Sequence, residues 1–145
     1  MNLVIDTNIV FSCLLNPKSI IGEIVLNYQD VIKFYAPNLL IDEIDRYSEK
    51  IEKYSKLNKS QLQICKLLLL NSIQFVSEDL ISSNCWLNAF NLTENIDEDD
   101  TPFVALALQM ETKLWSGDKK LSNGLLVKNS KIICTTLELK ILLSI

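Results

Sequence analysis

Short runs of branched and aromatic residues recur along the chain, and longer stretches with helix-like spacing of apolar residues separate them. The runs cover residues 3–5, 31–35, 73–76, 113–115 and 131–134. Such runs predict β-strands, and the chain between successive runs is long enough for the helix that a parallel crossover needs. The pattern therefore predicts an α/β protein whose central parallel sheet is covered by helices on both faces.

The intervening stretches carry helix start signals. Thr7 or Asn8 is expected to cap a helix at 9–15. Pro37 fits the first turn of a long helix that reaches about residue 57 and places Tyr47 on its apolar side. Further helices are expected at 20–28 after Ser19, after Asn58 or Ser60, from Ser77 to Phe90, at 102–110 after Asp99 or Asp100, and at 137–143 after Thr135 or Thr136.

Composition narrows the classes of function. The chain has 145 residues, of which 48% are hydrophobic, so we expect a single domain over residues 1–145. Its net charge is −4 and its pI is about 4.8, which excludes a broadly basic surface for nucleic acid. Histidine is absent, which excludes histidine zinc sites and Ser-His-Asp triads.

The cysteines and the apolar runs indicate the cellular compartment to expect for this protein. None of the four cysteines forms a C-x-x-C pair and each has apolar neighbours, so we expect buried, reduced thiols in a cytoplasmic protein. No signal peptide is expected, because the first apolar run ends at Asp6. The longest apolar run, at 67–70, is too short to cross a membrane.

Carboxylates stand where a parallel sheet would bring them together. Asp6 directly follows the first predicted strand, Asp118 follows the fourth, and the acidic stretch 94–100 precedes a helix. The carboxyl ends of parallel strands and the starts of the crossover helices share one edge, where open α/β sheets bind ligands. Glu43 lies about 9 Å along its helix from Pro37, within reach of that edge.

Crowded carboxylates repel one another unless they hold protons or a cation. An all-oxygen set without histidine or thiolate suits Mg²⁺ or Mn²⁺. A metal held in this way can activate water and clamp phosphate oxygens, which is the chemistry of phosphodiester hydrolysis. It also supplies the positive charge that an acidic protein lacks.

Four segments together resemble the PIN domain family: LVIDTN at 3–8, APNLLIDEI at 36–44, DEDDTPFVALA at 97–107 and LWSGD at 114–118. The resemblance spans essentially the whole chain. It implies a three-layer α/β/α sandwich with a central parallel sheet and an acidic pocket. Family members are Mg²⁺- or Mn²⁺-dependent nucleases, often ribonucleases and often the toxin of a bacterial toxin–antitoxin pair, so the resemblance implies an RNA substrate and an antitoxin partner.

The family's functional residues carry over by position. The four acids fall on Asp6, Glu43, Asp100 and Asp118, which the resemblance makes both metal ligands and catalytic residues. Ala107, seven residues after Asp100, fixes the choice of Asp100 within its acidic run. The polar residues that would orient the acids fall on Thr7, Asn8 and Ser116.

Some features depart from the family pattern or stay open. Lys119 and Lys120 stand where many members have a further acid; this favours a single ion, or contacts between the lysines and phosphates. The pattern fixes no role for Asp97 and Asp99, which read as a solvated acidic turn. The lysine run from Lys50 to Lys59 reads as a solvated helix face, with RNA contact as the alternative.

Two other functions compete with a nuclease. A degenerate PIN module would bind RNA or protein without cleaving. A phosphatase-like hydrolase of the HAD type also begins with an Asp after the first strand, but it requires a second Asp at the position of Asn8. A mean hydropathy of +0.19 also leads us to expect a homodimer.

Overall fold

The computed structural model describes all residues from 1 to 145 and contains one five-stranded parallel sheet of order β3-β2-β1-β4-β5. The strands are β1 (Asn2–Ile5), β2 (Lys33–Pro37), β3 (Ile73–Val76), β4 (Lys113–Trp115) and β5 (Ile133–Cys134). All five lie within two or three residues of the predicted runs. The predicted parallel sheet is confirmed.

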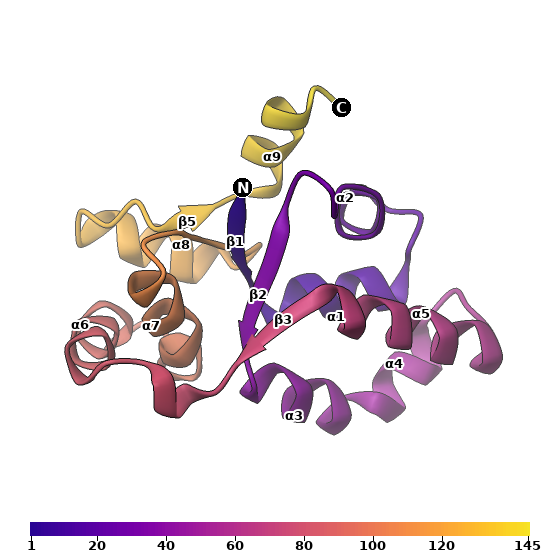
Figure 1. Cartoon of the computed structure of the whole chain (residues 1–145), viewed down its shortest axis with the longest axis horizontal. Helices are drawn as coiled ribbons and strands as arrows, with labels where there is room; N and C mark the ends of the chain where they lie inside the picture. Colours follow the sequence, from indigo (N-terminus) through magenta and orange to yellow (C-terminus); the bar gives the residue numbers. More distant parts are fainter.

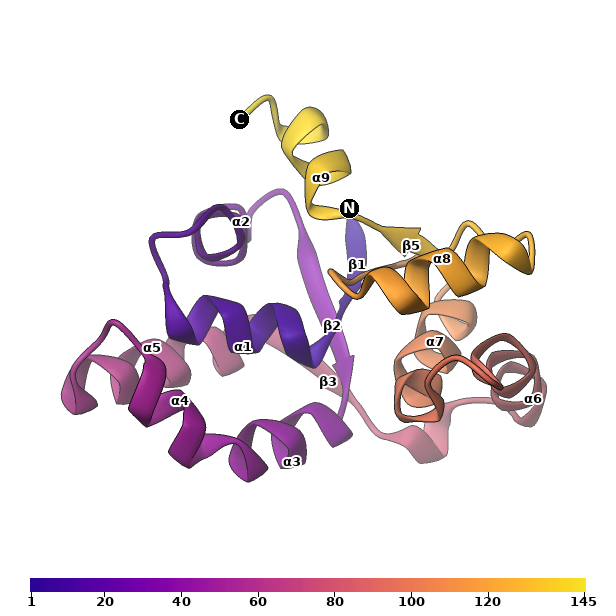
Figure 2. The same cartoon turned by 180° about the vertical axis from the view of Figure 1, so that it is seen from behind.

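Helices cover both faces of the sheet (Figures 1 and 2). Parallel crossovers are right-handed, so the connections from β1 to β3 and those from β3 to β5 place their helices on opposite faces. The first group is α1 (Thr7–Leu15), α2 (Ile20–Asn27), α3 (Leu39–Arg46), α4 (Ser48–Tyr54) and α5 (Lys59–Ser72). The second group is α6 (Ser83–Thr93), α7 (Thr101–Gln109) and α8 (Lys119–Val127), with α9 (Thr136–Leu143) following β5. The predicted α/β/α sandwich is confirmed.

The core lies between these layers. β1 and α7 are almost completely buried, and Phe34 of β2 meets Trp115 of β4 with ring centroids 6.0 Å apart. All four cysteines are unpaired; Cys13 and Cys134 are buried, as expected, whereas Cys65 and Cys85 are half-buried. Burial raises the pKa of the Cys13 thiol to about 12. No single helix has the length and apolar character needed to span a bilayer, although α1 and α2 pass that test as a pair bent by 104°.

The predicted long helix from Pro37 to residue 57 is wrong. Pro37 ends β2 and pairs with Val76 of β3, and the helical segment that follows is broken at Tyr47. Tyr47 closes α3 with backbone angles outside the helical range, and α4 starts at the next residue. The break leaves the Tyr47 side chain 42% exposed, not on the buried side as predicted.

Two other boundaries differ from the predictions. Ser77 caps only a short 3₁₀ turn, η1 (Glu78–Leu80), and Ser82 caps α6. Asp6, rather than Thr7 or Asn8, is the cap of α1. Helix α8 was not predicted; Asp118 caps it and accepts a hydrogen bond from the Leu121 N–H at 3.1 Å.

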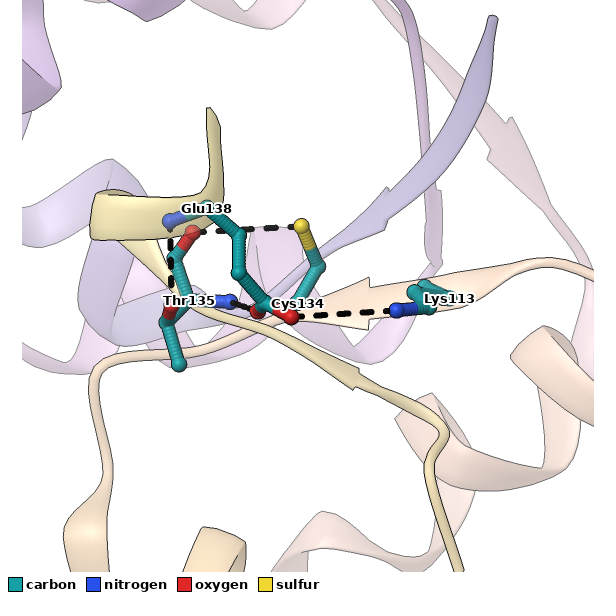
Figure 3. A network of polar contacts seen from close by, with 4 residues as sticks. All are labelled: Lys113, Cys134, Thr135 and Glu138. Atoms are coloured by element: carbon teal, nitrogen blue, oxygen red, sulfur yellow. Dashed lines mark hydrogen bonds and ion pairs between the residues drawn. The ribbon is translucent and has the colours of Figure 1, made fainter. Parts of the chain in front are cut away.

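A polar network anchors α9 to the sheet edge (Figure 3). Thr135 and Glu138 form a capping box, in which the Thr135 N–H donates to Glu138 Oε2 at 2.6 Å. Lys113 of β4 lies 3.9 Å from the other oxygen of Glu138. The hydrogen bond from the Thr135 N–H is the main reason that the pKa of Glu138 is lowered. The predicted start of the last helix at Thr135 or Thr136 is confirmed.

Candidate active site

The candidate site lies where the strand order reverses. Chain connections leave β1 toward β2 on one side and leave β4 toward β5 on the other, so the crevice beyond β1 and β4 is the topological switch point of the sheet. Asp6 follows β1 directly, and Ser116 to Asp118 follow β4. The sheet alone therefore brings two of the four predicted acids to adjacent strand ends.

Ser116 ties these two strand ends together. Its hydroxyl donates a hydrogen bond to Asp6 Oδ2 at 2.7 Å and accepts one from the Asp118 N–H at 3.1 Å. The Asp6 N–H donates to the carbonyl of Trp115 at 3.1 Å, which extends the β1–β4 pairing by one residue. Asp6 is 3% exposed and Ser116 is 2% exposed, so the side chain of Asp6 is held rigidly in a nearly dry position.

The acidic turn before α7 supplies the next two carboxylates. A 3₁₀ turn, η2 (Glu98–Asp100), leads directly into α7, and Asp97 caps it by accepting a hydrogen bond from the Asp99 N–H at 3.0 Å. Asp100 occupies the cap position of α7 but makes no side-chain cap hydrogen bond, so its carboxylate is free for another purpose. Ligand oxygens of Asp97, Asp100 and Asp118 all lie within 4.8 Å of one another.

A contact between two buried threonines holds the acidic turn in place. The hydroxyls of Thr93, at the end of α6, and Thr101, at the start of α7, lie 2.6 Å apart. The Thr93 hydroxyl also donates to the carbonyl of Ala89 at 2.9 Å, and both threonines are buried. This contact locks the seven-residue connection that carries the acids between α6 and α7.

Glu43 reaches the site from α3. Its Oε1 atom is buried and has no hydrogen-bond partner. It lines a pocket of about 250 Å³ together with Arg46, Asp99 and other residues of α3, η2 and α7. Burial raises the pKa of Glu43 and the charge of Asp6 raises it further, while the neighbouring Thr7 hydroxyl opposes the shift. Asp6 and Glu43 therefore share one electrostatic environment, and the Thr7 side chain lies beside Glu43.

The pKa values of Asp6 and Asp100 are also raised. Burial raises the pKa of Asp6, and the charge of Asp118 adds to that effect, while hydrogen bonds from Ser116 and the Asn8 backbone oppose it. The pKa of Asp100 is raised to about 8, first by burial and then by Asp6, Asp97, Asp118 and Glu43. Without a cation, the site therefore retains protons near neutral pH.

The predicted orienting residues behave differently from one another. Ser116 contacts both Asp6 and Asp118, as described above. The Thr7 hydroxyl is buried without a hydrogen-bond partner, so it is available to a ligand or a bound water. The Asn8 side chain is exposed, and only the Asn8 N–H reaches Asp6, at 3.5 Å from Oδ1.

Asp97 is the acid that sequence reasoning assigned to a solvated turn. The structure instead places its carboxylate with those of Asp100 and Asp118. The sequence feature that could have indicated this role for Asp97 is its position three residues before Asp100, in a turn that starts a helix. Glu98 and Asp99 are exposed, as predicted.

Comparisons with known proteins identify the family. A model of the PIN domain matches residues 4–139. The chain belongs to the PIN domain family. It is also 32% identical, over 83% of its length and 73% of the relative's, to an uncharacterized protein of Methanocaldococcus jannaschii. Proteins with PIN domains are generally metal-dependent nucleases.

A solved structure supports the same fold. A chain of VapBC2 from Rickettsia felis, crystallised with a DNA fragment from its promoter, matches with a TM-score of 0.65. The match covers 93% of this chain and 98% of that chain at 16% sequence identity. The resemblance at this identity concerns the fold of the PIN domain.

The residues present fit a divalent cation. The donor set consists of carboxylate and hydroxyl oxygens, which hard cations prefer. Asp100 Oδ2, Glu43 Oε1 and Thr7 Oγ1 are buried polar atoms without a partner in the protein, and such atoms are costly unless something else binds them. A cation near Asp6, Asp100 and Asp118 would offset the repulsion among these carboxylates, which adds to burial in raising the pKa values of Asp6 and Asp100.

Proposed function

We propose that this PIN domain is an Mg²⁺- or Mn²⁺-dependent endoribonuclease whose metal ligands and catalytic residues are Asp6, Glu43, Asp100 and Asp118. The observation that supports the proposal is the grouping of the Asp97, Asp100 and Asp118 carboxylates within 4.8 Å of one another. The charges of Asp6 and Glu43 act on Asp100, and buried carboxylate oxygens of Glu43 and Asp100 have no hydrogen-bond partner. Helix caps and surface turns do not need such an arrangement, because they satisfy their own oxygens. Asp97 joins the set as a further ligand or as a neighbour that tunes Asp100.

Each of these residues has a separate role in the proposed phosphodiester hydrolysis. A bound divalent cation supplies an activated water and stabilises the charge on the phosphate and the leaving oxygen. Ser116 fixes Oδ2 of Asp6, so the other carboxylate oxygen, Oδ1, keeps one direction. Asp100, whose pKa is raised to about 8, can hold or accept a proton close to neutral pH, and burial raises the pKa of Glu43 in the same direction. Thr7 offers its hydroxyl beside them.

The test compares cleavage of a labelled RNA in Mn²⁺ by wild type, Asp6→Asn and a control, Asp30→Asn. Asp30 is exposed and precedes β2, at the opposite edge of the sheet. We expect wild type and Asp30→Asn to cleave equally and Asp6→Asn to lose at least 100-fold in rate while it remains folded. Equal cleavage by Asp6→Asn and wild type would exclude the proposal.

The same proteins separate a nuclease from a PIN module that binds RNA or a protein without cleaving. A catalytic site binds the ion and gains thermal stability from it. Calorimetric titration with Mn²⁺ should therefore show binding that Asp6→Asn weakens. A module without a metal site gives no heat and no shift in melting temperature.

The biological setting is also part of the proposal. We propose that the chain acts in the cytoplasm as the toxin of a toxin–antitoxin pair, with a small protein as its antitoxin, and that it forms a homodimer. The family membership and the likeness of its fold to VapBC2 support this role. Co-purification with the product of a neighbouring small reading frame tests the first point, and sedimentation analysis tests the second.

A further inference from the structure

A second pocket lies directly beside the acids. It has a volume of about 150 Å³ and is lined by Thr7, Asn8, Phe11, Tyr47 and Lys50. Thr7 is the residue after Asp6, and Thr7, Asn8 and Phe11 lie on the first turns of α1. Because Thr7 directly follows Asp6, this pocket adjoins the proposed metal site.

Two aromatic rings and one cation form this pocket. The rings of Phe11 and Tyr47 meet edge to face, with centroids 6.1 Å apart and planes at 74°. The Lys50 ammonium lies 5.5 Å from the centroid of the Phe11 ring. Tyr47 is 42% exposed, so part of its side chain remains accessible to a ligand. An exposed aromatic surface beside an ammonium is the combination that binds a base together with a phosphate.

Helix α3 links this pocket to the metal site. The Tyr47 N–H donates to the carbonyl of Glu43 at 3.1 Å, so the two side chains start one helical turn apart. Tyr47 also lines the larger pocket that contains Glu43 and Arg46. A continuous surface therefore runs from Glu43 past Tyr47 to Lys50.

The charges around the pocket also favour a ligand that carries a base and a phosphate. The chain is acidic overall, and the acids of the site repel a polyanion wherever a metal does not offset them. Arg46 and Lys50 border Tyr47 on either side of the helix break, so this flank of the site carries two cations. They offer contacts to the phosphates next to the one that is cleaved.

We propose that Phe11, Tyr47 and Lys50 form a subsite that takes one unstacked base of a single-stranded RNA beside the scissile phosphate, with Lys50 on an adjacent phosphate. This inference rests on the proposed nuclease function, because it uses the acids to locate the scissile phosphate. A base that stacks on a protein ring must first leave its neighbours, so a duplex cannot occupy the subsite without melting.

The chain provides a matched control. Tyr54 on α4 is 58% exposed and has Lys53 5.3 Å above its ring, but it lines none of the pockets that flank the acids. The experiment measures fluorescence anisotropy of a labelled single-stranded oligoribonucleotide and of its matched duplex in Ca²⁺, a cation that carboxylate oxygens also bind, so that the charge of the acids is offset; a gel checks that the RNA stays intact. It uses wild type, Tyr47→Ala, Tyr47→Phe, Lys50→Gln and Tyr54→Ala.

Wild type should bind the single strand more tightly than the duplex. Tyr47→Ala should weaken single-strand binding roughly 5- to 100-fold, the range for one stacked base, while Tyr47→Phe and Tyr54→Ala stay near wild type. Lys50→Gln should weaken binding and reduce the slope of log Kd against log salt by about 1. Mn²⁺ affinity should not change in Tyr47→Ala, and the variant should remain folded.

Several results would overturn the subsite: no binding of the single strand by wild type, unchanged binding by Tyr47→Ala, or an equal loss in Tyr54→Ala. If Tyr47→Ala binds the single strand as tightly as wild type, the pocket would instead bind a protein partner. The proposed function fails separately. If wild type binds RNA through Tyr47 but does not cleave it in Mn²⁺, the nuclease proposal fails and the subsite stands. If wild type cleaves RNA but Tyr47→Ala binds it as tightly as wild type, the subsite fails and the nuclease proposal stands.

Discussion

Replacing Asp100 by asparagine should stabilise the metal-free protein at neutral pH. The Asp100 carboxyl has a pKa of about 8 in the folded protein, compared with an ordinary value of 3.8. Below pH 4 the carboxyl is protonated in both the folded and the unfolded chain. Between pH 4 and pH 8 the unfolded chain releases the proton and the folded chain retains it, so stability falls as the pH rises. Asparagine resembles the neutral carboxyl and removes this loss.

The magnitude follows from the size of the pKa difference. At ~1.36 kcal/mol per pH unit, a fully isolated carboxyl with these pKa values would lose about 4 kcal/mol between pH 4 and pH 7. Asp100 remains partly in contact with water, and its proton is shared among interacting acids, so we expect about 1–2 kcal/mol. For a domain of this size, that corresponds to roughly 3–6 °C in melting temperature.

The assay is thermal unfolding in EDTA at pH 5, 6, 7 and 8 for wild type, Asp100→Asn and Asp30→Asn. Wild type and the control should lose melting temperature steadily as the pH rises, whereas Asp100→Asn should lose less and exceed wild type at pH 7. Saturating Mn²⁺ should reverse the order, because an ion at 100 times its Kd adds about 2.7 kcal/mol to a protein that binds it.

A wild-type melting temperature that is constant from pH 5 to pH 8 in EDTA would refute the reasoning. So would an Asp100→Asn variant that melts below wild type at pH 7, since the carboxylate would then contribute favourable contacts in the metal-free fold.

Two further substitutions test the scaffold around the acids. Ser116→Ala removes the hydroxyl that orients Asp6, so Mn²⁺ affinity measured by calorimetry should fall roughly 10- to 100-fold; an affinity within twofold of wild type would contradict this role. In Gly22→Ala, the new Cβ would lie 2.2 Å from the carbonyl oxygen of Pro17, so urea unfolding should show a loss of about 1–3 kcal/mol despite the better helix propensity of alanine. Gly117→Ala, where the nearest atom is 4.0 Å away, should cost much less, and equal losses in the two variants would contradict the packing argument.

The sheet could be predicted because its strands are short, rich in branched and aromatic residues and largely buried in the centre of the sheet, and such runs differ clearly from the helices between them. The position of Asp6 and Asp118 followed from topology alone, since parallel strands end at one edge. Their separation along the chain carried no information about their proximity. The hydroxyl of Ser116 joins the two strand ends at the level of side chains, because it donates to Asp6 and accepts from the Asp118 N–H.

The errors occurred where contacts distant in sequence decide the local structure. Proline suits both the first turn of a helix and the end of a strand, so Pro37 was ambiguous. Helix α3 begins later because Glu78 accepts a hydrogen bond from the Leu39 N–H at 2.7 Å, and that partner lies 39 residues away. The break at Tyr47 allows α3 and α4 both to contact α1, which no local pattern encodes.

Asp97 illustrates the same limit within the site. As a residue in an exposed acidic run, it was most simply a solvated cap, and it does cap η2. Its second contact, with Asp100 and Asp118, depends on the path that the α6–α7 connection takes above β4. The threonine pair behind that connection is eight residues apart in sequence and has no pattern that marks it.

The central claim is that carboxylates from β1, β4 and the start of α7 share a divalent cation. Anomalous diffraction from crystals grown with Mn²⁺ tests it most directly. We predict a manganese peak at the switch point, about 2.0–2.2 Å from carboxylate oxygens that include those of Asp6, Asp100 or Asp118. Crystals that contain Mn²⁺ but show no peak within coordination distance of any of these three residues would contradict the account.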